Sequence, residues 1–174
     1  MLVTEIRPLT EAELDLLKYL PFSHPDTHRR RFGLQQRGEL VFLVAWQSRM
    51  PVGQVLLQWR GGDNAAIQPK PRPYPEIASL FVSPEYRLKG TATQLIDTAE
   101  AIARQQGHTH IGLCVATDNG PALSLYKRLQ YKDAGWDEYR ARGVYIEQDG
   151  SQQTWEETRI YLTKALHQPA YRTS

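Results

Sequence analysis

The sequence has almost no cysteine, since Cys114 is the only one among its 174 residues. A single thiol excludes a disulfide within the chain and a zinc site built from cysteines. Disulfides stabilise proteins of oxidising compartments, and nothing in this composition indicates one. We therefore expect a protein of the reducing cytoplasm.

The sequence also lacks an excess of charge of one sign. It has 21 Lys and Arg against 19 Asp and Glu, which gives a net charge of +2 with neutral histidines. Charges of both signs are interspersed along the chain, so the protein has a weak overall field. Composition therefore gives no reason to expect a nucleic acid or an anionic membrane as a partner.

Long hydrophobic runs are missing as well. The longest strongly apolar run, Leu40 to Trp46, is far shorter than the roughly 20 residues of a membrane span. No positively charged and then apolar leader opens the chain, so we expect no secretion signal. With 41% hydrophobic residues, the chain is instead expected to form one globular domain over residues 1–174.

The first third of the chain predicts a strand, two helices and a hairpin. Thr10 and Glu13 have the spacing of a capping box, and Asp26 is a candidate cap for the second helix. Gly38 is placed to end that helix. The expected elements are a strand before Pro8, helices over 11–20 and 26–37, and paired strands over 40–46 and 52–59.

Residues 61–75 predict an extended loop. Four prolines alternate with other residues from Pro69 to Pro75, and neither a helix nor a strand ladder tolerates that pattern. The segment is read as a surface connection, with a flap over a site or a ligand for a proline-binding module as alternatives.

The remaining sequence predicts strands and helices in alternation. Apolar residues from Ala92 to Ala103 recur at helical spacing, and Gly107 is a natural helix end. The expected elements are strands over 76–82 and 110–116, helices over 91–106 and from Asn119, and two tail strands over 131–134 and 158–164. This order predicts an α/β fold in which a helix connects two parallel strands.

A candidate ligand-binding loop lies between the strand at 76–82 and the helix at 91–106. A helix start offers unpaired N–H donors to an anion, and Gly90 lets the backbone approach it. Lys89 precedes Gly90 instead of following it, which excludes a nucleotide P-loop, and no G-x-G-x-x-G is present. The loop predicts an anion site of another kind.

Two motifs in this region resemble those of the GCN5-related N-acetyltransferase (GNAT) family. Its V-x-P and Q/R-x-x-G-x-G/A signature is matched by Val82, Pro84, Arg87, Gly90 and Ala92. A downstream pattern is matched by Asn119, Ala122 and Tyr126. The sequence departs from the family at Gln130-Tyr131, where Gly-Phe is common, and this puts the entry to the next strand in doubt.

The resemblance implies a mixed, mostly antiparallel sheet flanked by helices and acetyl-CoA as the co-substrate. The pyrophosphate would be held by backbone amides of the loop before the helix, and the pantetheine arm would lie along the preceding strand. Asn119 would reach the cofactor, although a helix cap is its alternative role. The implied cofactor-binding residues are Leu80, Phe81, Val82, Arg87, Leu88, Lys89, Gly90, Thr91, Ala92 and Asn119.

The same resemblance assigns two candidate catalytic residues. Glu76 would remove a proton from the acceptor amine, whereas a solvent-facing strand end is its alternative reading. Tyr126 would protonate the departing thiolate, although it is also suited to the core. The backbone N–H near Val82 would stabilise the oxyanion.

Other reactive side chains are read as structural. Cys114 lies in an apolar strand and is expected to be inert, rather than a nucleophile. His24 and His28 have helical metal-ligand spacing, but Pro25 lies between them and no metal is expected. The run from Arg29 to Arg31 is read as a solvated face.

The sequence thus predicts direct transfer of an acetyl group to the primary amine of a small molecule. Protein N-termini or lysines are alternative acceptors, and a non-catalytic acyl-CoA-binding module is the alternative to an enzyme. Trp136 and Tyr139 are candidates for the acceptor pocket. A homodimer is possible on this interpretation.

Overall fold

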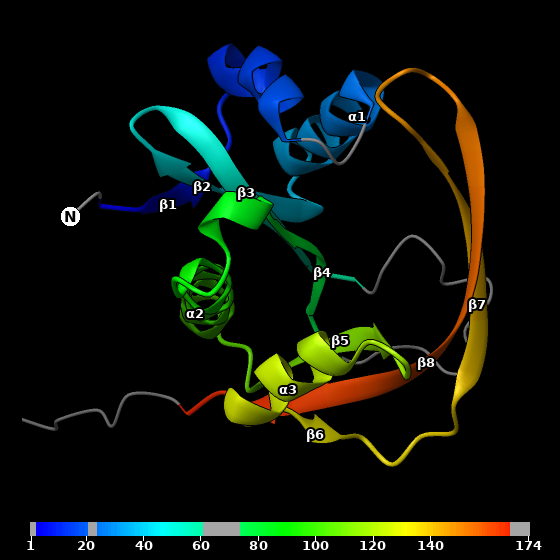
Figure 1. Ribbon diagram of the computed structural model, residues 1–174. Coiled ribbons are helices and arrows are strands. Elements are labelled where there is room, and N and C mark those ends of the chain that lie inside the picture. The colour runs from blue at the N-terminus through cyan, green and yellow to red at the C-terminus, as the bar shows by residue number, and fades with distance from the viewer. Residues whose placement is uncertain (1–2, 21–23, 61–73, 168–174) are drawn as a thin grey trace, which may run out of the picture.

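A computed structural model describes residues 3–20, 24–60 and 74–167. Eight strands form one mixed sheet in the order β1-β2-β3-β4-β5-β8-β6, and β7 pairs with β8 (Figure 1). The predicted fold class is confirmed. The sheet consists of an N-terminal half, β1 to β4, and a C-terminal half that begins at β5.

The N-terminal half is an antiparallel meander. It contains β1 (Glu5–Pro8), β2 (Leu40–Gln47), β3 (Met50–Gln58) and β4 (Glu76–Val82). Ser48 and Arg49 both have positive φ, as the tight turn between β2 and β3 requires. The helical segments η1 (Glu11–Tyr19) and α1 (Pro25–Gln36) cover one face of this half.

The C-terminal half begins with a crossover. Strand β4 leads through the short η3 (Pro84–Tyr86) and helix α2 (Thr91–Gln105) into β5 (His110–Ala116), which is parallel to β4. Helix α3 (Gly120–Arg128) follows, and then β6 (Lys132–Asp133), β7 (Tyr139–Ile146) and β8 (Gln152–Ala165). The parallel pair with a crossover helix is confirmed.

Two apolar cores lie on opposite faces of the sheet. Apolar residues of α2 and α3 pack against one face, where Leu57, Ile77 and Leu113 are buried. Leu17 and Phe32 pack against Phe42 and Leu56 on the other face, under η1 and α1. Successive strand residues point to opposite faces, so β3 and β4 contribute alternately to both cores.

The two N-terminal helices differ from expectation in detail. The first is a 3₁₀ helix, because Leu14, Leu17 and Leu20 recur every three residues and match its three-residue turn. The predicted cap at Asp26 is wrong. His24 caps α1 instead, with Nδ1 accepting a hydrogen bond from the backbone N–H of Asp26 at 3.2 Å.

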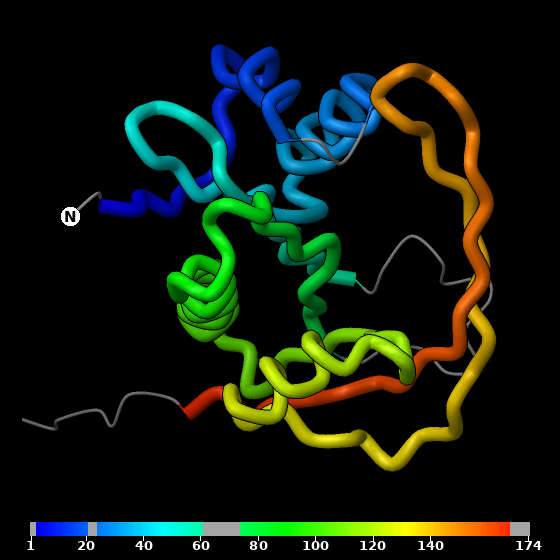
Figure 2. The backbone as a smooth tube through the Cα atoms, viewed as in Figure 1, coloured from blue at the N-terminus to red at the C-terminus, as the bar shows by residue number. Residues whose placement is uncertain are grey.

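The C-terminal strands differ from the sequence prediction more than the N-terminal helices do. Strand β7 was not expected, and β8 begins at Gln152 instead of Thr158. The outer parts of β7 and β8 pair only with each other and form a projecting arm (Figure 2). Because most side chains of the arm are exposed, its sequence has no alternation of apolar and polar residues that would indicate a strand.

The doubtful strand entry after α3 is intact. Gln130 adopts a φ of 68°, the left-handed conformation that a glycine would occupy without strain. The chain therefore makes the same kind of turn with a glutamine. The proline-rich prediction over residues 61–73 lies outside the described residues.

Candidate functional site

The centre of the candidate site is a split in the sheet. Strands β4 and β5 pair at only two positions, Glu76 with Gly112 and Ile77 with Leu113, and then diverge. From Ala78 to Val82, β4 is paired with β3 but has lost its partner on the other side. This part of β4 is an open strand edge inside the molecule, and such an edge can pair with the amide groups of an extended ligand.

A bulge at Ser79 turns β4 away from β5. Ser79 has a φ of 52°, and the register of β3 and β4 shifts between Gln54 and Leu56. Two side chains hold the bulge: Arg31 donates to the Ser79 hydroxyl at 3.0 Å, and Gln54 Nε2 donates to the Ser79 carbonyl at 3.4 Å. The sequence predicted a solvated face for Arg29 to Arg31. That prediction is wrong for Arg31, because its side chain contacts Ser79.

The end of β4 presents a backbone donor to the split. The N–H of Ser83 bonds to the Val52 carbonyl of β3. Because N–H groups of successive strand residues point to opposite edges, the N–H of Val82 points toward the split. This direction agrees with the predicted oxyanion donor, while the Val82 carbonyl accepts a hydrogen bond from Arg87 Nε at 2.9 Å.

The loop after β4 leads the open edge to the N-terminus of α2. Leu88 and Gly90 both have positive φ, and Gly90 is the N-cap residue without a side-chain cap. The first amides of α2 therefore have neither a helical partner nor a capping side chain. Lys89 folds back, with Nζ donating to the Glu85 carbonyl at 2.8 Å. The loop thus offers backbone donors at the positive end of a fifteen-residue helix.

Glu76 lies at the closed end of the split. Its side chain is 2% exposed, and its Cα partners are Gln58 on β3 and Gly112 on β5. The burial contradicts the reading of Glu76 as a solvent-facing strand end. The carboxylate is on the sheet face covered by η1 and α1, because the adjacent Ile77 belongs to the core under α2.

Tyr126 approaches from α3. It is 7% exposed and its ring meets that of Tyr131 edge to face at 5.7 Å. Burial raises the pKa of Tyr126 to about 12, so the hydroxyl is protonated at neutral pH. The structure therefore places Tyr126 in the core, with a hydroxyl in the protonation state that a proton donor needs.

Asn119 is a helix cap, which is the alternative role that the sequence suggested for it. Its Oδ1 accepts from the backbone N–H of Ala122 at 3.2 Å and caps α3. This cap fixes the start of α3 at the end of β5, beside the split.

The face opposite α2 carries polar side chains that sequence reasoning missed. Tyr161 of β8 lies over Gly112, where an added Cβ would be 2.0 Å from the tyrosine hydroxyl. Gly112 is the partner of Glu76, so the Tyr161 hydroxyl lies near the closed end of the split. A glycine inside an apolar strand was the available signal, because it marks a close approach of another group.

The two residues named for the acceptor pocket lie on this face. Trp136 stacks on Tyr161, with ring centroids 4.6 Å apart. Tyr139 donates its hydroxyl to the Cys114 sulfur at 2.9 Å. The structure thus brings Trp136 and Tyr139 to the same side of the split as Glu76.

His28 and Gln54 add buried polar atoms near the bulge. His28 is 2% exposed, and neither ring nitrogen has a hydrogen-bond partner in the described part of the chain. Burial, and secondarily the nearby Arg31, lower the pKa of His28 to about 4. His28 is therefore neutral at physiological pH and stacks against Phe42.

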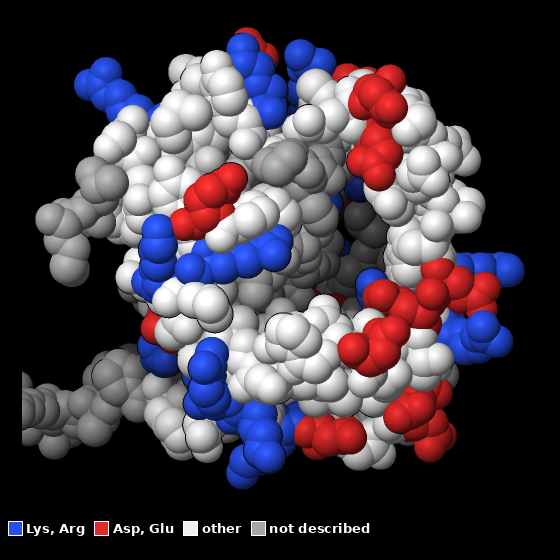
Figure 3. Space-filling view, viewed as in Figure 1, with Lys and Arg blue, Asp and Glu red and all other residues white. Residues whose placement is uncertain are grey.

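The arm formed by β7 and β8 closes over this face. At its tip, Gln148 Nε2 donates to the carbonyls of Lys18 and Leu20, at 3.3 and 2.9 Å, and the His24 N–H donates to the Ile146 carbonyl at 3.2 Å. Figure 3 shows a hollow between the arm and the body, with Asp and Glu side chains along the arm. Lys and Arg side chains gather near the start of α2.

No group of three or more metal-ligating side chains occurs among residues 3–20, 24–60 and 74–167. In the same ranges, no helix is long and apolar enough to cross a membrane.

The sequence is similar to known acetyltransferases. A model described as the acetyltransferase (GNAT) family matches residues 9–131. An uncharacterised N-acetyltransferase of Methanocaldococcus jannaschii is 32% identical over 107 residues, which are 59% of this chain and 46% of that protein. The N-alpha-acetyltransferase of Saccharolobus solfataricus is 29% identical over 122 residues, 68% of this chain and 69% of that protein. The chain spans less than half the length of the curated relatives that match first.

The fold is also similar to a solved structure. A PaiA N-acetyltransferase from Thermoplasma acidophilum, in complex with coenzyme A, superposes with a TM-score of 0.61 at 19% identity. The match covers 94% of this chain and 99% of that one. At this identity the likeness supports the fold.

Proposed function

The chain belongs to the GNAT acetyltransferase family, and from this premise we propose that it transfers the acetyl group of acetyl-CoA to the primary amine of a small molecule. The observation that carries the proposal is the open edge of β4 leading into the uncapped start of α2. An extended ligand with amide groups at one end and a pyrophosphate at the other is complementary to that sequence of backbone donors.

The proposed cofactor contacts follow the chain. Residues Leu80 to Val82 pair with the pantetheine amides along the open edge, and backbone amides from Leu88 to Ala92 hold the pyrophosphate, because the Arg87 N–H already donates to the Pro84 carbonyl. The Arg87 and Lys89 side chains bond to backbone carbonyls, so their contribution is to shape the loop and add positive charge. Asn119 contributes by capping α3 beside the split, with a cofactor contact as its further predicted role.

The proposed chemistry is a direct attack of the amine on the thioester. Glu76, directly or through water, accepts a proton from the ammonium group, and the neutral nitrogen forms a bond to the carbonyl carbon. The N–H near Val82 donates to the oxyanion. The carbon–sulfur bond then breaks, Tyr126 donates its proton to the thiolate, and the nitrogen returns its second proton to the tyrosinate, directly or through water, which leaves an acetylated amine and CoA. The raised pKa of Tyr126 keeps that proton available at neutral pH.

A small acceptor is favoured by the closed arm. Three hydrogen bonds hold its tip against η1 and the start of α1, and they restrict access to the face that carries Glu76. A lysine on the surface of a folded protein needs an open groove, whereas a small amine can enter the hollow of Figure 3.

An acetyltransferase for protein N-termini is the second candidate. The similarity to the N-alpha-acetyltransferase of Saccharolobus solfataricus over about two thirds of both chains favours it. A flexible N-terminal peptide, unlike a folded surface, can also thread under the arm.

The deciding experiment measures CoA-thiol release from acetyl-CoA with small amines, and separately with peptides of varied N-terminal residues. We expect release with one or more small amines and little with peptides. Release with peptides alone would assign the second candidate.

A matched pair of variants tests the cofactor site by calorimetry. Gly90→Trp places a bulky side chain in the proposed pyrophosphate loop and is expected to abolish acetyl-CoA binding. Gly107→Trp is the control, because Gly107 has a φ of 85° against 84° for Gly90 and lies at the opposite end of α2. Equal binding by both variants would refute the proposed cofactor site.

A further inference from the structure

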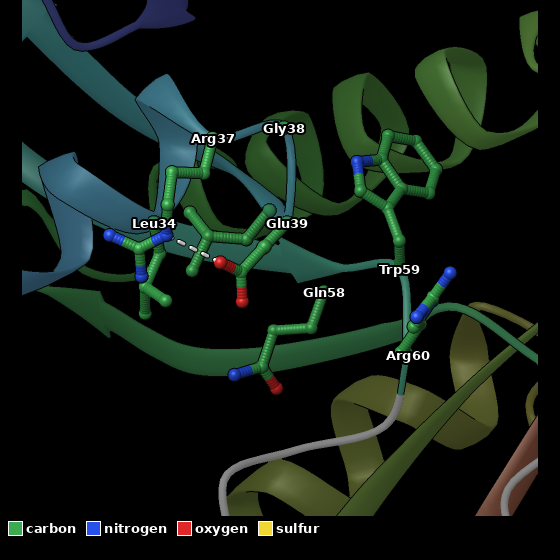
Figure 4. Close-up of a pocket in the computed structure, with 8 residues that line it drawn as sticks. Leu34, Arg37, Gly38, Glu39, Gln58, Trp59 and Arg60 are labelled. Atoms are coloured by element: carbon green, nitrogen blue, oxygen red, sulfur yellow. Dashed lines mark hydrogen bonds and ion pairs between the residues drawn. The ribbon is translucent and has the colours of Figure 1, made fainter.

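A pocket of about 340 Å³ lies where α1 ends and β2 begins. Its wall is formed by Leu34, Leu40 and the three residues between α1 and β2, together with the last residue of β3 and the two residues that follow it (Figure 4). The volume is at the lower end of the roughly 300–1,000 Å³ of small-molecule sites. It therefore suits a small molecule or part of a larger one.

Gln58 supplies the pocket with an unpaired buried carbonyl oxygen. The residue is 7% exposed, and its Oε1 has no hydrogen-bond partner in the described part of the chain. A buried polar atom left unpaired is unfavourable, so a group in the pocket that donates to Oε1 gains from it. The unpaired oxygen of Gln58 in the wall of the pocket therefore indicates a ligand that donates a hydrogen bond to it.

The register connects this pocket to the proposed base. Gln58 and Glu76 are direct partners on the antiparallel strands β3 and β4. Side chains of directly opposed residues lie on the same face, with Cβ atoms about 4.5–5.5 Å apart. A molecule that presents its amine to Glu76 therefore has its remainder within reach of Gln58 and the pocket.

The charges around the pocket favour an anionic group. Arg37 Nε donates to Glu39 at 2.6 Å, so these two charges balance. Arg60 lines the rim and has no ion-pair partner in the described ranges. Arginine is the residue that best recognises a carboxylate, through paired N–H donors. The apolar wall from Leu34 and Leu40 suits a short methylene chain.

We propose that this pocket binds the distal carboxylate and chain of an amino acid whose reacting amine lies at Glu76. The inference rests on the proposed function and narrows its acceptor to compounds with an amine and a carboxylate at opposite ends of a short apolar chain. Arg60 contacts the carboxylate, and Gln58 contributes a hydrogen bond beside Glu76.

The first test compares ω-amino acids of increasing chain length with alkylamines of the same length that lack the carboxylate. We expect kcat/KM to favour the amino acids by at least about tenfold, the value of one hydrogen-bonded charge. Arg60→Gln removes this preference, whereas Arg49→Gln, an exposed arginine in the β2–β3 turn, preserves it. Equal use of both series by the unmodified protein overturns the inference.

Gln58→Leu separates binding from folding. The change removes a buried oxygen that has no hydrogen-bond partner in the described part of the chain, so we expect thermal stability to hold or rise while KM for the amino acid increases and KM for acetyl-CoA is unchanged. A parallel change of both KM values, or no change of either, contradicts a direct role of Gln58 in the acceptor site.

A binding measurement does not depend on turnover. Calorimetry with 6-aminohexanoate and with its N-acetyl derivative, on protein saturated with CoA, is expected to show binding that Arg60→Gln weakens by about tenfold. Absence of binding by both compounds overturns the inference even if CoA binds. Failure of CoA to bind would instead refute the proposed function, and the same titration without CoA would then decide on the pocket alone.

Discussion

At the scale of single residues, Glu76 shows that strand register decides whether a side chain is buried. Its sequence context allowed a solvent-facing strand end or a buried carboxylate. Pairing with Gln58 on one side and Gly112 on the other encloses it, and 2% of it is exposed. The family resemblance singled out the residue, but only strand pairing determined its environment.

Tyr126 carries the first prediction. Tyr126→Phe removes the proposed proton donor and is expected to lower kcat about 100-fold with little change in KM for acetyl-CoA, as loss of acid catalysis does. Steady-state kinetics checks it. Tyr131→Phe is the matched control, because that hydroxyl donates to Glu100 at 2.9 Å, and its loss should affect stability more than kcat. Equal kcat in Tyr126→Phe and the unmodified protein would remove Tyr126 from the mechanism.

His28 gives a prediction about pH and stability. Its pKa is about 4 in the folded protein, against 6.5 when unperturbed. Between these values the unfolded chain binds a proton that the folded protein does not, so stability is greatest above pH 6.5 and falls as the pH is lowered toward 4. The expected loss is about 1.6 kcal/mol from pH 6.5 to 5.

Urea unfolding at the two pH values measures this loss. His28→Phe retains a ring against Phe42 and should remove most of the pH dependence. His167→Gln changes an exposed histidine and should preserve it. A pH dependence that is the same in His28→Phe as in the unmodified protein would show that another group is responsible.

At the scale of elements, the arm of β7 and β8 depends on pairing and on its tip. The strands pair over eight positions from Tyr139 to Ile146, yet most of their side chains are exposed. An exposed two-stranded ribbon has little stability of its own. The hydrogen bonds of Gln148 and Ile146 to the N-terminal elements therefore set how closed the arm is.

Gln148→Ala tests that dependence. Loss of the bonds to the Lys18 and Leu20 carbonyls should increase hydrogen exchange over residues 139–157, while the free energy of unfolding changes by less than about 1.5 kcal/mol. Hydrogen-exchange mass spectrometry measures both effects. Gln153→Ala, in the exposed part of β8, is the control. Unchanged exchange over the arm in Gln148→Ala would show that β-pairing alone closes it.

At the scale of the whole molecule, the two halves of the sheet are joined weakly at the strands and strongly at α2. The β4–β5 ladder has two residue pairs. Glu100 of α2 is 4% exposed and accepts hydrogen bonds from Tyr131 and from Lys164 of β8, the latter at 2.7 Å. The buried carboxylate thus fastens α2 to the C-terminal half, because its charge and hydrogen bonds are all satisfied there.

A ligand in the split is expected to stabilise this arrangement. Acetyl-CoA at 100 times its dissociation constant should add about 2.7 kcal/mol, which corresponds to a rise of roughly 5–10 °C in Tm for a domain of this size. Differential scanning calorimetry checks it. Gly107→Trp should show the full rise and Gly90→Trp none. A full rise in Gly90→Trp would place the ligand elsewhere.

Much of the molecule follows from the sequence alone. The apolar periodicity and the glycines predicted β4 at its observed bounds, α2 to within one residue and the parallel crossover between β4 and β5. These are elements with one strongly buried face, and burial is the property that residue patterns encode. The motif from Val82 to Ala92 located the loop at the start of α2, because that loop is formed by residues that are adjacent in the sequence.

Other features were decided only by tertiary structure. Three such features depend on contacts between residues that are separated in the sequence. They are the buried environment of Glu76, the position of Tyr161 over Gly112 and the exposed pairing of β7 with β8. Their side chains obey no local period, because their positions depend on strand register and on which edge of the sheet lacks a partner. The local motifs of the sequence were enough to identify the family and to propose a cofactor loop, whereas contacts between distant segments form the pocket from which we infer the acceptor.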